Sequence, residues 1–176
     1  MTRRLLAALL LWVPATVATA LAMGAAGIAL EVPVVQQAPE RCGQAALEMV
    51  FRYYGADASV LHEADSAYDP ALRGSLITDL AAAARRAGYE AEISTLTPDS
   101  LVGLLAAGVP PIVLYQNGRA PLTVPHYGVV TGWDPVREAF TLNDGGTHPR
   151  RVDRGSLEKR WRTAGSQALI LRRRSP

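Results

Sequence analysis

The chain has 176 residues, of which 49% are hydrophobic and 19% are charged, so it can bury a core as one domain and is not an intrinsically disordered chain. Its 18 Lys and Arg face 16 Asp and Glu, and two of the basic residues, Arg3 and Arg4, lie at the N-terminus. The rest of the chain is therefore close to neutral, which argues against nucleic acid as its partner.

Residues 1–30 form a segment of their own. A basic start, "MTRR", precedes a charge-free run that lasts until Glu31, and that run exceeds the roughly 20 residues a membrane-spanning helix needs. Small residues at alternating positions fit the small-x-small pattern of a signal-peptidase site: Ala18, Ala20 and Ala22. We expect a cleaved signal peptide, with a retained membrane anchor as the alternative. Either would export residues 31–176 across the cytoplasmic membrane to the periplasm or cell envelope.

Residues 31–176 are predicted to form one domain whose first half is mainly helical. After a proline-flanked extended approach, apolar residues recur every three or four positions from Gly43, which is typical of a helix with one buried face. The predicted elements of this half are, in order, a helix over 43–55, an irregular stretch over 56–74, a helix over 75–88, a strand over 89–95 and a helix over 97–108.

The second half is predicted to consist mainly of strands. Its β-branched and aromatic runs are separated by segments rich in Asn, Gly and Pro. The predicted elements are, in order, a strand over 109–116, a loop over 117–125, a strand over 126–134, a hairpin turn over 135–138, a strand over 139–145, a helix over 155–165 and a strand over 167–174. Helices followed by antiparallel strands predict an α+β domain in which helices pack against one sheet.

Cys42 is the only cysteine of the chain, and it lies where the first predicted helix begins. In an exported protein an odd cysteine indicates either an intermolecular disulfide or a free reactive thiol. Backbone N–H groups and the helix dipole at such a position favour the thiolate, which is the nucleophilic form. Charged residues on its approach, Glu40 and Arg41, argue against the alternative of a buried cysteine that only fills space. We therefore interpret Cys42 as a candidate nucleophile.

A thiolate nucleophile needs a base, and the chain offers three histidines. His62 lies among acidic residues in the irregular stretch and His148 precedes a proline in a turn, so both are predicted to be exposed. His126 opens the apolar strand "HYGVVTG", where a polar ring at the strand end can project into a cleft. The alternative for His126 is a core histidine whose nitrogens are satisfied by hydrogen bonds.

A base needs a partner that orients it, and the strand after His126 in the hairpin offers two. Asp144 shares a face with the apolar Phe140 and Leu142 by the two-residue period, so it is predicted to point inward near His126. Asn143 would point the other way unless a bulge changes the parity. Thiolate, imidazole and carboxylate together support acyl transfer.

The oxyanion of such a reaction needs hydrogen-bond donors, and a glutamine just before the nucleophile can supply one beside the backbone N–H of Cys42. Gln36 and Gln37 both precede the cysteine at a suitable distance, and Gln44 lies on the helix itself. The residues alone leave the choice among them open.

The segment "QQAPERCGQAALEMVFRYYG" resembles the active-site segment of the bacteriocin-processing peptidases, the double-glycine leader peptidase family, which has a papain-like fold. That family has a Gln, then five residues, then Cys-Gly-x-Ala on a helix that ends in Tyr-Gly. The resemblance implies that Gln36 is the oxyanion glutamine and Cys42 the nucleophile. It extends over about 32–172 through the landmarks "LAAAARRAGYEAE", "LVGLLAAGVPPIVLY" and "HYGVVTGWD".

The same resemblance implies that His126 is the base and Asp144 the third member of the triad. The family Asp is usually followed by Pro, whereas this chain reads "LNDGG", so Asn143 stays open as a substitute.

The expected function is that of an exported or envelope-anchored cysteine peptidase that acts on a peptide or protein. An amidase or transpeptidase on the same fold would use the same residues, and a binding module without catalysis is the third alternative. We expect no cofactor and no metal, because one cysteine and three scattered histidines lack the spacing of metal ligands.

Overall fold

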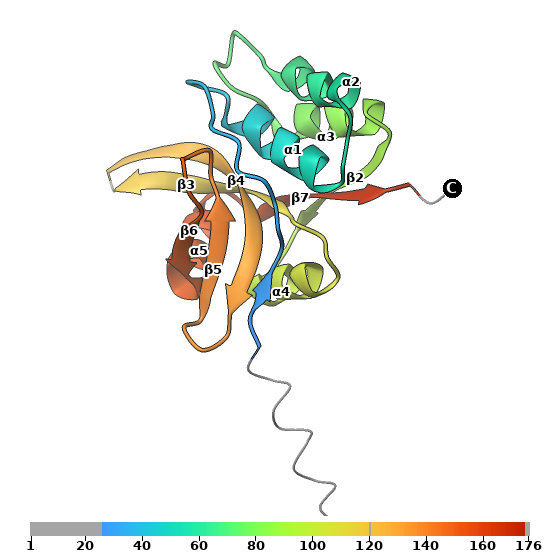
Figure 1. The fold of residues 1–176 in the computed structure, drawn as a ribbon. Coiled ribbons are helices and arrows are strands. Elements are labelled where there is room, and N and C mark those ends of the chain that lie inside the picture. The colour runs from blue at the N-terminus through green and yellow to red at the C-terminus, as the bar shows by residue number, and fades with distance from the viewer. Residues whose placement is uncertain (1–25, 120, 175–176) are drawn as a thin grey trace, which may run out of the picture.

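The computed structural model describes residues 26–119 and 121–174 (Figure 1). Its helices are α1 (Cys42–Tyr53), α2 (Ala58–Leu61), the 3-10 helix η1 (His62–Ala67), α3 (Ile77–Arg86), α4 (Pro98–Ala106) and α5 (Arg154–Thr163). Its strands are β1 (Ile28–Ala29), β2 (Tyr89–Thr95), β3 (Ile112–Arg119), β4 (Leu122–Asp134), β5 (Ala139–Asn143), β6 (Arg150–Asp153) and β7 (Gln167–Arg173). The strands form one sheet in the order β2-β7-β3-β4-β5-β6, with β1 on β4, and every pairing is antiparallel. The predicted α+β class is confirmed.

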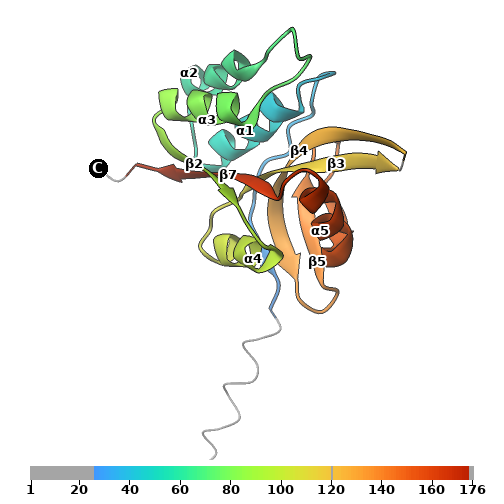
Figure 2. The ribbon, with the colours of Figure 1, turned by 180° about the vertical axis from the view of Figure 1, so that it is seen from behind.

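The helices cover both faces of this sheet. α1, α2 and α3 lie on one side, whereas α4 and α5 lie on the other (Figures 1 and 2). Each side has its own apolar core. On the α1 side the fully buried side chains include Leu47, Phe51, Leu80, Val129 and Leu169. On the other side they include Leu101, Tyr115, Phe140, Leu142 and Trp161.

α1 packs against the rest of the protein through its buried face and through a contact at its C-terminal end. This packing holds Cys42, the first residue of α1, in place. Its buried face includes Leu47, Val50 and Phe51, and burying each such side chain stabilises the fold by roughly 1.5–3 kcal/mol. At the far end of α1, the hydroxyl of Tyr53 donates to the carbonyl of Gly108 over 3.0 Å. The predicted helix is confirmed, and it presents Cys42 at its N-terminal end.

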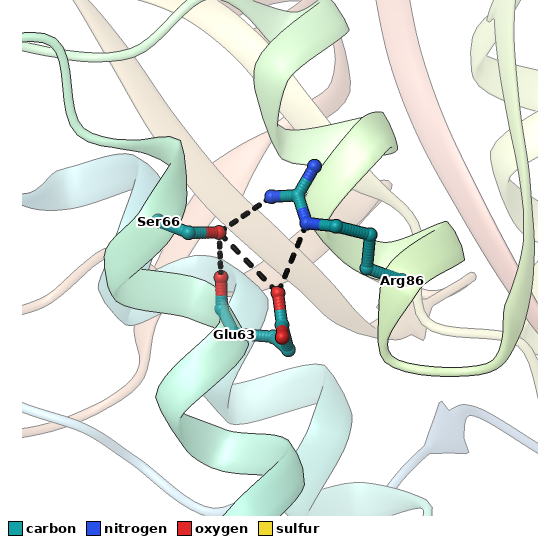
Figure 3. A network of polar contacts seen from close by, with 3 residues as sticks. All are labelled: Glu63, Ser66 and Arg86. Atoms are coloured by element: carbon teal, nitrogen blue, oxygen red, sulfur yellow. Dashed lines mark hydrogen bonds and ion pairs between the residues drawn. The ribbon is translucent and has the colours of Figure 1, made fainter.

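The stretch predicted to be irregular contains two short helices instead. The side chain of Asp57 caps α2 by accepting hydrogen bonds from the backbone N–H groups of Ser59 and Val60. A helix that depends on such a cap cannot be predicted from apolar periodicity. Figure 3 shows how η1 is tied to α3: Arg86 binds both the carboxylate of Glu63 (3.1 Å) and the hydroxyl of Ser66 (2.6 Å). These two contacts therefore anchor η1 on α3.

The predicted loop 117–125 is wrong over most of its length. β3 and β4 continue into it as a hairpin, with Asn117 opposite Val124 and Gly118 opposite Thr123. Pairing along the two strands outweighs the local turn signals, and Gly118 takes a positive φ of 100° that suits glycine. A strand that was not predicted, β6, pairs with β5 after the turn that follows Asp144.

The predicted signal peptide or anchor falls on residues 1–30, and most of this segment lies outside the described residues. Among the residues that the structure does describe, no helix has the length and apolar character needed to cross a membrane.

Candidate active site

Cys42 is the first residue of α1, and its thiol is half-buried. Burial raises the pKa of the Cys42 thiol, but hydrogen bonds from the His126 ring and from the backbone N–H groups of Tyr127 and Gly43 outweigh burial. The pKa of Cys42 therefore lies below its ordinary value, which favours the thiolate.

His126 is held between the thiol and the chain that follows β5. Its Nε2 lies 2.9 Å from the backbone carbonyl oxygen of Asp144. A carbonyl can only accept, so Nε2 carries the proton and Nδ1 is left for the thiol of Cys42. Burial lowers the pKa of His126, but its bonds to Cys42 and to the Asp144 carbonyl raise the pKa above the ordinary value. Both shifts favour a thiolate–imidazolium pair.

Asp144 reaches His126 in a way that the sequence does not predict. Its backbone carbonyl, rather than its carboxylate, accepts the hydrogen bond from the ring. The carboxylate is paired with Arg150, with 2.9 Å between Oδ2 and Nε, and accepts a bond of 3.3 Å from the hydroxyl of Tyr115. The negative charge nevertheless contributes through space to the raised pKa of His126.

Asn143 points away from this constellation. Its side chain is buried and donates from Nδ2 to the backbone carbonyl of Val32 over 2.9 Å. The alternation of side chains along β5 puts Asp144 on the opposite face, beside Tyr115. The geometry thus brings Asp144, and not Asn143, to His126.

The three candidate glutamines lie in different environments. The Gln36 side chain is exposed and does not line the cleft that holds Cys42, whereas Gln37 is half-buried and lines it. The backbone N–H of Gln37 donates to the carbonyl of Gly145 over 3.0 Å, so its position depends on the turn beside Asp144. Gln44 is buried and donates to Ser75.

A cleft with a volume of about 820 Å³ opens over Cys42 and His126. One wall comes from residues 72–78 and the other from residues 124–127. Large apolar side chains stand partly in solvent on both walls, with exposed fractions of 53% for Leu72, 52% for Leu76 and 60% for Val124. Such exposed apolar groups around a polar pair are typical of a binding site.

The wall formed by residues 72–78 is connected to the loop that precedes the nucleophile. Glu40 has a positive φ of 66°, which a non-glycine residue rarely adopts, and its carboxylate accepts from Tyr68 (3.2 Å) and from Arg73 (2.7 Å). On the other side, the hydroxyl of Tyr127 donates to the carbonyl of Ser75 over 3.2 Å. These contacts fix the width of the cleft.

Two polar residues of the site, Tyr115 and Arg150, are absent from the sequence-based prediction. Tyr115 lies directly opposite His126 in the β3–β4 pair, and their rings meet edge to face at 5.6 Å. Arg150 lies opposite Leu142 on β6, which puts it on the same face as Asp144. The register of two strand pairs decides both positions, and no local pattern encodes that register.

The other polar candidates lie outside the cleft. His62 and His148 are exposed, as predicted. Asp134 accepts from the backbone of Val136 and Arg137 in the turn after β4. Within residues 26–119 and 121–174, no group of three His, Cys, Asp or Glu side chains is placed to hold a metal ion.

A cysteine at the start of a helix, packed against an antiparallel sheet that carries its histidine, defines the class of the papain-like cysteine peptidases. A family model described as the Peptidase_C39 like family matches residues 29–169, and the chain belongs to this family. The resemblance to double-glycine leader peptidases and the predicted papain-like fold are confirmed. The chain is thus of the cysteine peptidase class.

Several solved structures of peptidases have a fold similar to that of this chain. The peptidase domain of Streptococcus ComA, a bi-functional ABC transporter involved in a quorum sensing pathway, has 20% identity and a TM-score of 0.66, over 81% of this chain and 99% of that one. A putative C39-like peptidase from Bacillus anthracis has 20% identity and a TM-score of 0.70, over 86% and 100%. A double glycine motif protease from an AMS/PCAT transporter, solved with the leader peptide, has 22% identity and a TM-score of 0.64, over 83% and 94%. No curated protein matches the chain significantly.

Proposed function

We propose that the protein is an exported cysteine peptidase that hydrolyses peptide bonds with Cys42 as nucleophile and His126 as acid and base. The observation that carries this proposal is the contact between the His126 ring and the Cys42 thiol at the start of α1, inside an apolar cleft. The leader peptide bound to one of the similar proteases supports a peptide as the substrate of this one.

The proposed reaction begins when the thiolate of Cys42 attacks the carbonyl carbon of a peptide bond, which moves an electron pair onto the carbonyl oxygen. The imidazolium of His126 then gives its proton to the amide nitrogen, the C–N bond breaks and the amine leaves. A water molecule loses a proton to His126 as it attacks the remaining thioester, and the thiolate of Cys42 is released.

Two donors are proposed for the oxyanion of this reaction. The first is the backbone N–H of Cys42, because the first N–H groups of an α-helix have no acceptor within the helix. The second is the side-chain amide of Gln37, which lines the cleft, rather than that of Gln36, which is exposed. Asp144 is proposed to orient the imidazole through its backbone carbonyl.

The proposal includes export to the cell envelope, which rests on the N-terminal sequence. The basic start and the charge-free run before Glu31 support a signal peptide or an anchor. The mass of the protein recovered from an envelope fraction tests this part: a mass below that of the full chain indicates cleavage, the full mass indicates an anchor, and recovery from the cytoplasm alone contradicts export.

The pH dependence of iodoacetamide alkylation of Cys42 tests the chemistry. Reactivity that persists well below the unperturbed thiol pKa of about 8.5 in wild type, and is lost in His126→Ala, is the expected result. Ordinary thiol titration that is indifferent to His126 would leave a binding module without catalysis. Product analysis with and without an added amine then separates a peptidase from a transpeptidase.

A further inference from the structure

The turn that follows β5 contacts the proposed base and the proposed oxyanion donor through two consecutive backbone carbonyls. The carbonyl oxygen of Asp144 lies 2.9 Å from Nε2 of His126. The next carbonyl, that of Gly145, accepts a hydrogen bond of 3.0 Å from the backbone N–H of Gln37. Neighbouring peptide groups therefore hold these two parts of the site, and Gly145 is the residue of the turn that binds Gln37.

Gly145 also contacts the side chain of Gln37, and this contact leaves no room for a Cβ atom. A Cβ at Gly145 would lie 2.7 Å from Cγ and 2.8 Å from Cδ of Gln37, and closer still to its Oε1. Heavy atoms repel each other strongly at these distances, since their optimal separation is about 3.5–4.0 Å. The side chain of Gln37 thus occupies the volume that a side chain at position 145 would need.

Packing against the turn holds the amide of Gln37 in one orientation. Its Oε1 is buried and, within residues 26–119 and 121–174, has no hydrogen-bond partner. A buried acceptor without a partner costs stability, so the surrounding structure has to keep the amide in place. Because Oε1 is enclosed beside Gly145, the Nε2 end is left for the cleft, which Gln37 lines. Nε2 is the end that can donate to an oxyanion.

The backbone conformation at Gly145 is a separate reason for a glycine and needs its own control. Its φ is 81°, in the left-handed region that residues with a Cβ rarely adopt. Gly88, just after α3, has a similar φ of 92°, but nothing lies within 4 Å of its Cβ position. The two glycines share the conformation and differ in the contact with a functional side chain.

We propose that Gly145 is a positioning residue whose missing side chain lets the Gln37 amide point its Nε2 at the oxyanion. This inference rests on the proposed peptidase function, because it takes Gln37 as the oxyanion donor. It adds that one turn positions the base through the carbonyl of Asp144 and the donor through Gly145. In Gly145→Ala the side chain of Gln37 has to leave the turn, while Cys42 and His126 keep their contact.

Peptide hydrolysis by the full chain in a neutral detergent tests this role. We expect Gly145→Ala to lower kcat by about a hundredfold, the usual cost of losing one oxyanion donor, and to leave KM nearly unchanged. The pH profile of Cys42 alkylation should stay as in wild type, since it reports the thiol and the imidazole rather than the oxyanion donor. Wild-type kcat in Gly145→Ala would overturn the proposal, and so would an altered alkylation profile, which indicates a distorted turn.

Two glycine variants are matched controls. Gly88→Ala adds a Cβ at a positive φ without a contact. Gly146→Ala adds one to the same turn, where the nearest atom, Oδ1 of Asp144, lies at an ordinary 3.6 Å. Both should keep kcat within about twofold of wild type. A loss of kcat in either control as large as that in Gly145→Ala would assign the effect to backbone strain or to the turn as a whole, and would overturn the proposal.

The double variant Gln37→Ala/Gly145→Ala tests whether Gly145 acts through Gln37. Once the Gln37 side chain is gone, a Cβ at position 145 has nothing to displace. Adding Gly145→Ala to Gln37→Ala should therefore change kcat by no more than about twofold. A further loss of about a hundredfold, as expected for independent effects, would overturn the proposal.

NMR spectroscopy of the Gln37 side-chain amide tests the contact without turnover. Its N–H signals, identified by their absence in Gln37→Ala, should shift in Gly145→Ala and keep their position in Gly88→Ala. Such a shift in a protein that hydrolyses no peptide would support the placement of Gln37 by Gly145 and count against the proposed function. Unchanged signals in Gly145→Ala would overturn the inference and leave the peptidase.

Discussion

The carboxylate of Asp144 pairs with Arg150, at 2.9 Å between Oδ2 and Nε, while the backbone carbonyl of the same aspartate holds the ring of His126. One residue thus connects a charged anchor on β6 to the proposed base. We infer that the side chain of Arg150 restrains where this carbonyl lies, because Arg150 holds the carboxylate of the same residue, Asp144. Arg150 is in this sense a positioning residue.

Replacing Arg150 should therefore impair the chemistry of Cys42. In Arg150→Gln we expect the alkylation rate of Cys42 below the ordinary thiol pKa to fall by about tenfold to a hundredfold, since small misplacements of a catalytic group carry such costs. The measurement is the pH profile of alkylation, with Arg151→Gln as control because Arg151 is the exposed neighbour on the same strand. An unchanged profile in Arg150→Gln would refute the positioning role.

The two glutamines before the nucleophile make a matched pair for testing the oxyanion donor. Gln37→Ala should lower kcat by about a hundredfold or more, the usual cost of losing one oxyanion donor, with little effect on Cys42 alkylation. Gln36→Ala should leave kcat within about twofold of wild type, since its side chain is exposed outside the cleft. A large loss of kcat in Gln36→Ala and none in Gln37→Ala would instead make Gln36 the oxyanion donor, as the family resemblance implies.

The thiolate of Cys42 and the imidazolium of His126 should coexist only within a limited range of pH, and activity should be confined to that range. The pKa of Cys42 is lowered, so the thiolate persists as pH falls below about 8.5, and it is lost once pH falls through the folded-state pKa. The pKa of His126 is raised, so the imidazolium persists above about 6.5 and is lost as pH rises through its own folded-state pKa. The rate of peptide hydrolysis should therefore be bell-shaped over this range. In His126→Asn, burial of the thiol is left unopposed by the ring, and alkylation should need a higher pH.

The apolar walls of the cleft should set substrate preference. Leu72→Ser and Leu76→Ser should each raise KM for a peptide with a bulky apolar residue at the scissile bond by a few fold, because each substitution removes part of the apolar contact. Both side chains are about half exposed, so thermal stability should barely change. Val136→Ser is the control, an exposed apolar residue outside the cleft. Equal KM values in all three variants would contradict this role.

Gly43 should be required for its close packing beside the nucleophile. A Cβ there would meet Ser75 Oγ at 3.1 Å and Leu80 Cδ2 at 3.2 Å, so Gly43→Ala should shift the 72–78 wall and lower activity. Gly103→Ala in α4 is the control: nothing lies within 4 Å of its Cβ, and alanine in a helix should add about 0.5–1 kcal/mol to the free energy of unfolding. Chemical denaturation and peptide hydrolysis together measure both effects, and wild-type activity in Gly43→Ala would contradict the first.

The sequence by itself determined the α+β class, the helix that begins at the lone cysteine, the strand that carries His126 and the strand that ends just before Asp144. These features follow from apolar periods of 3.6 and 2 residues, which reflect local backbone geometry. The inward face of Asp144 followed in the same way from its alternation with Phe140 and Leu142.

Only the tertiary structure decided how these parts meet. It turned Asp144 so that its carbonyl faces His126 and its carboxylate faces Arg150, and it brought Gln37 rather than Gln36 into the cleft. It also extended the β3–β4 hairpin through a segment rich in turn residues, next to α5. Strand register and long-range packing set each of these outcomes, and a single sequence does not encode them in any local pattern.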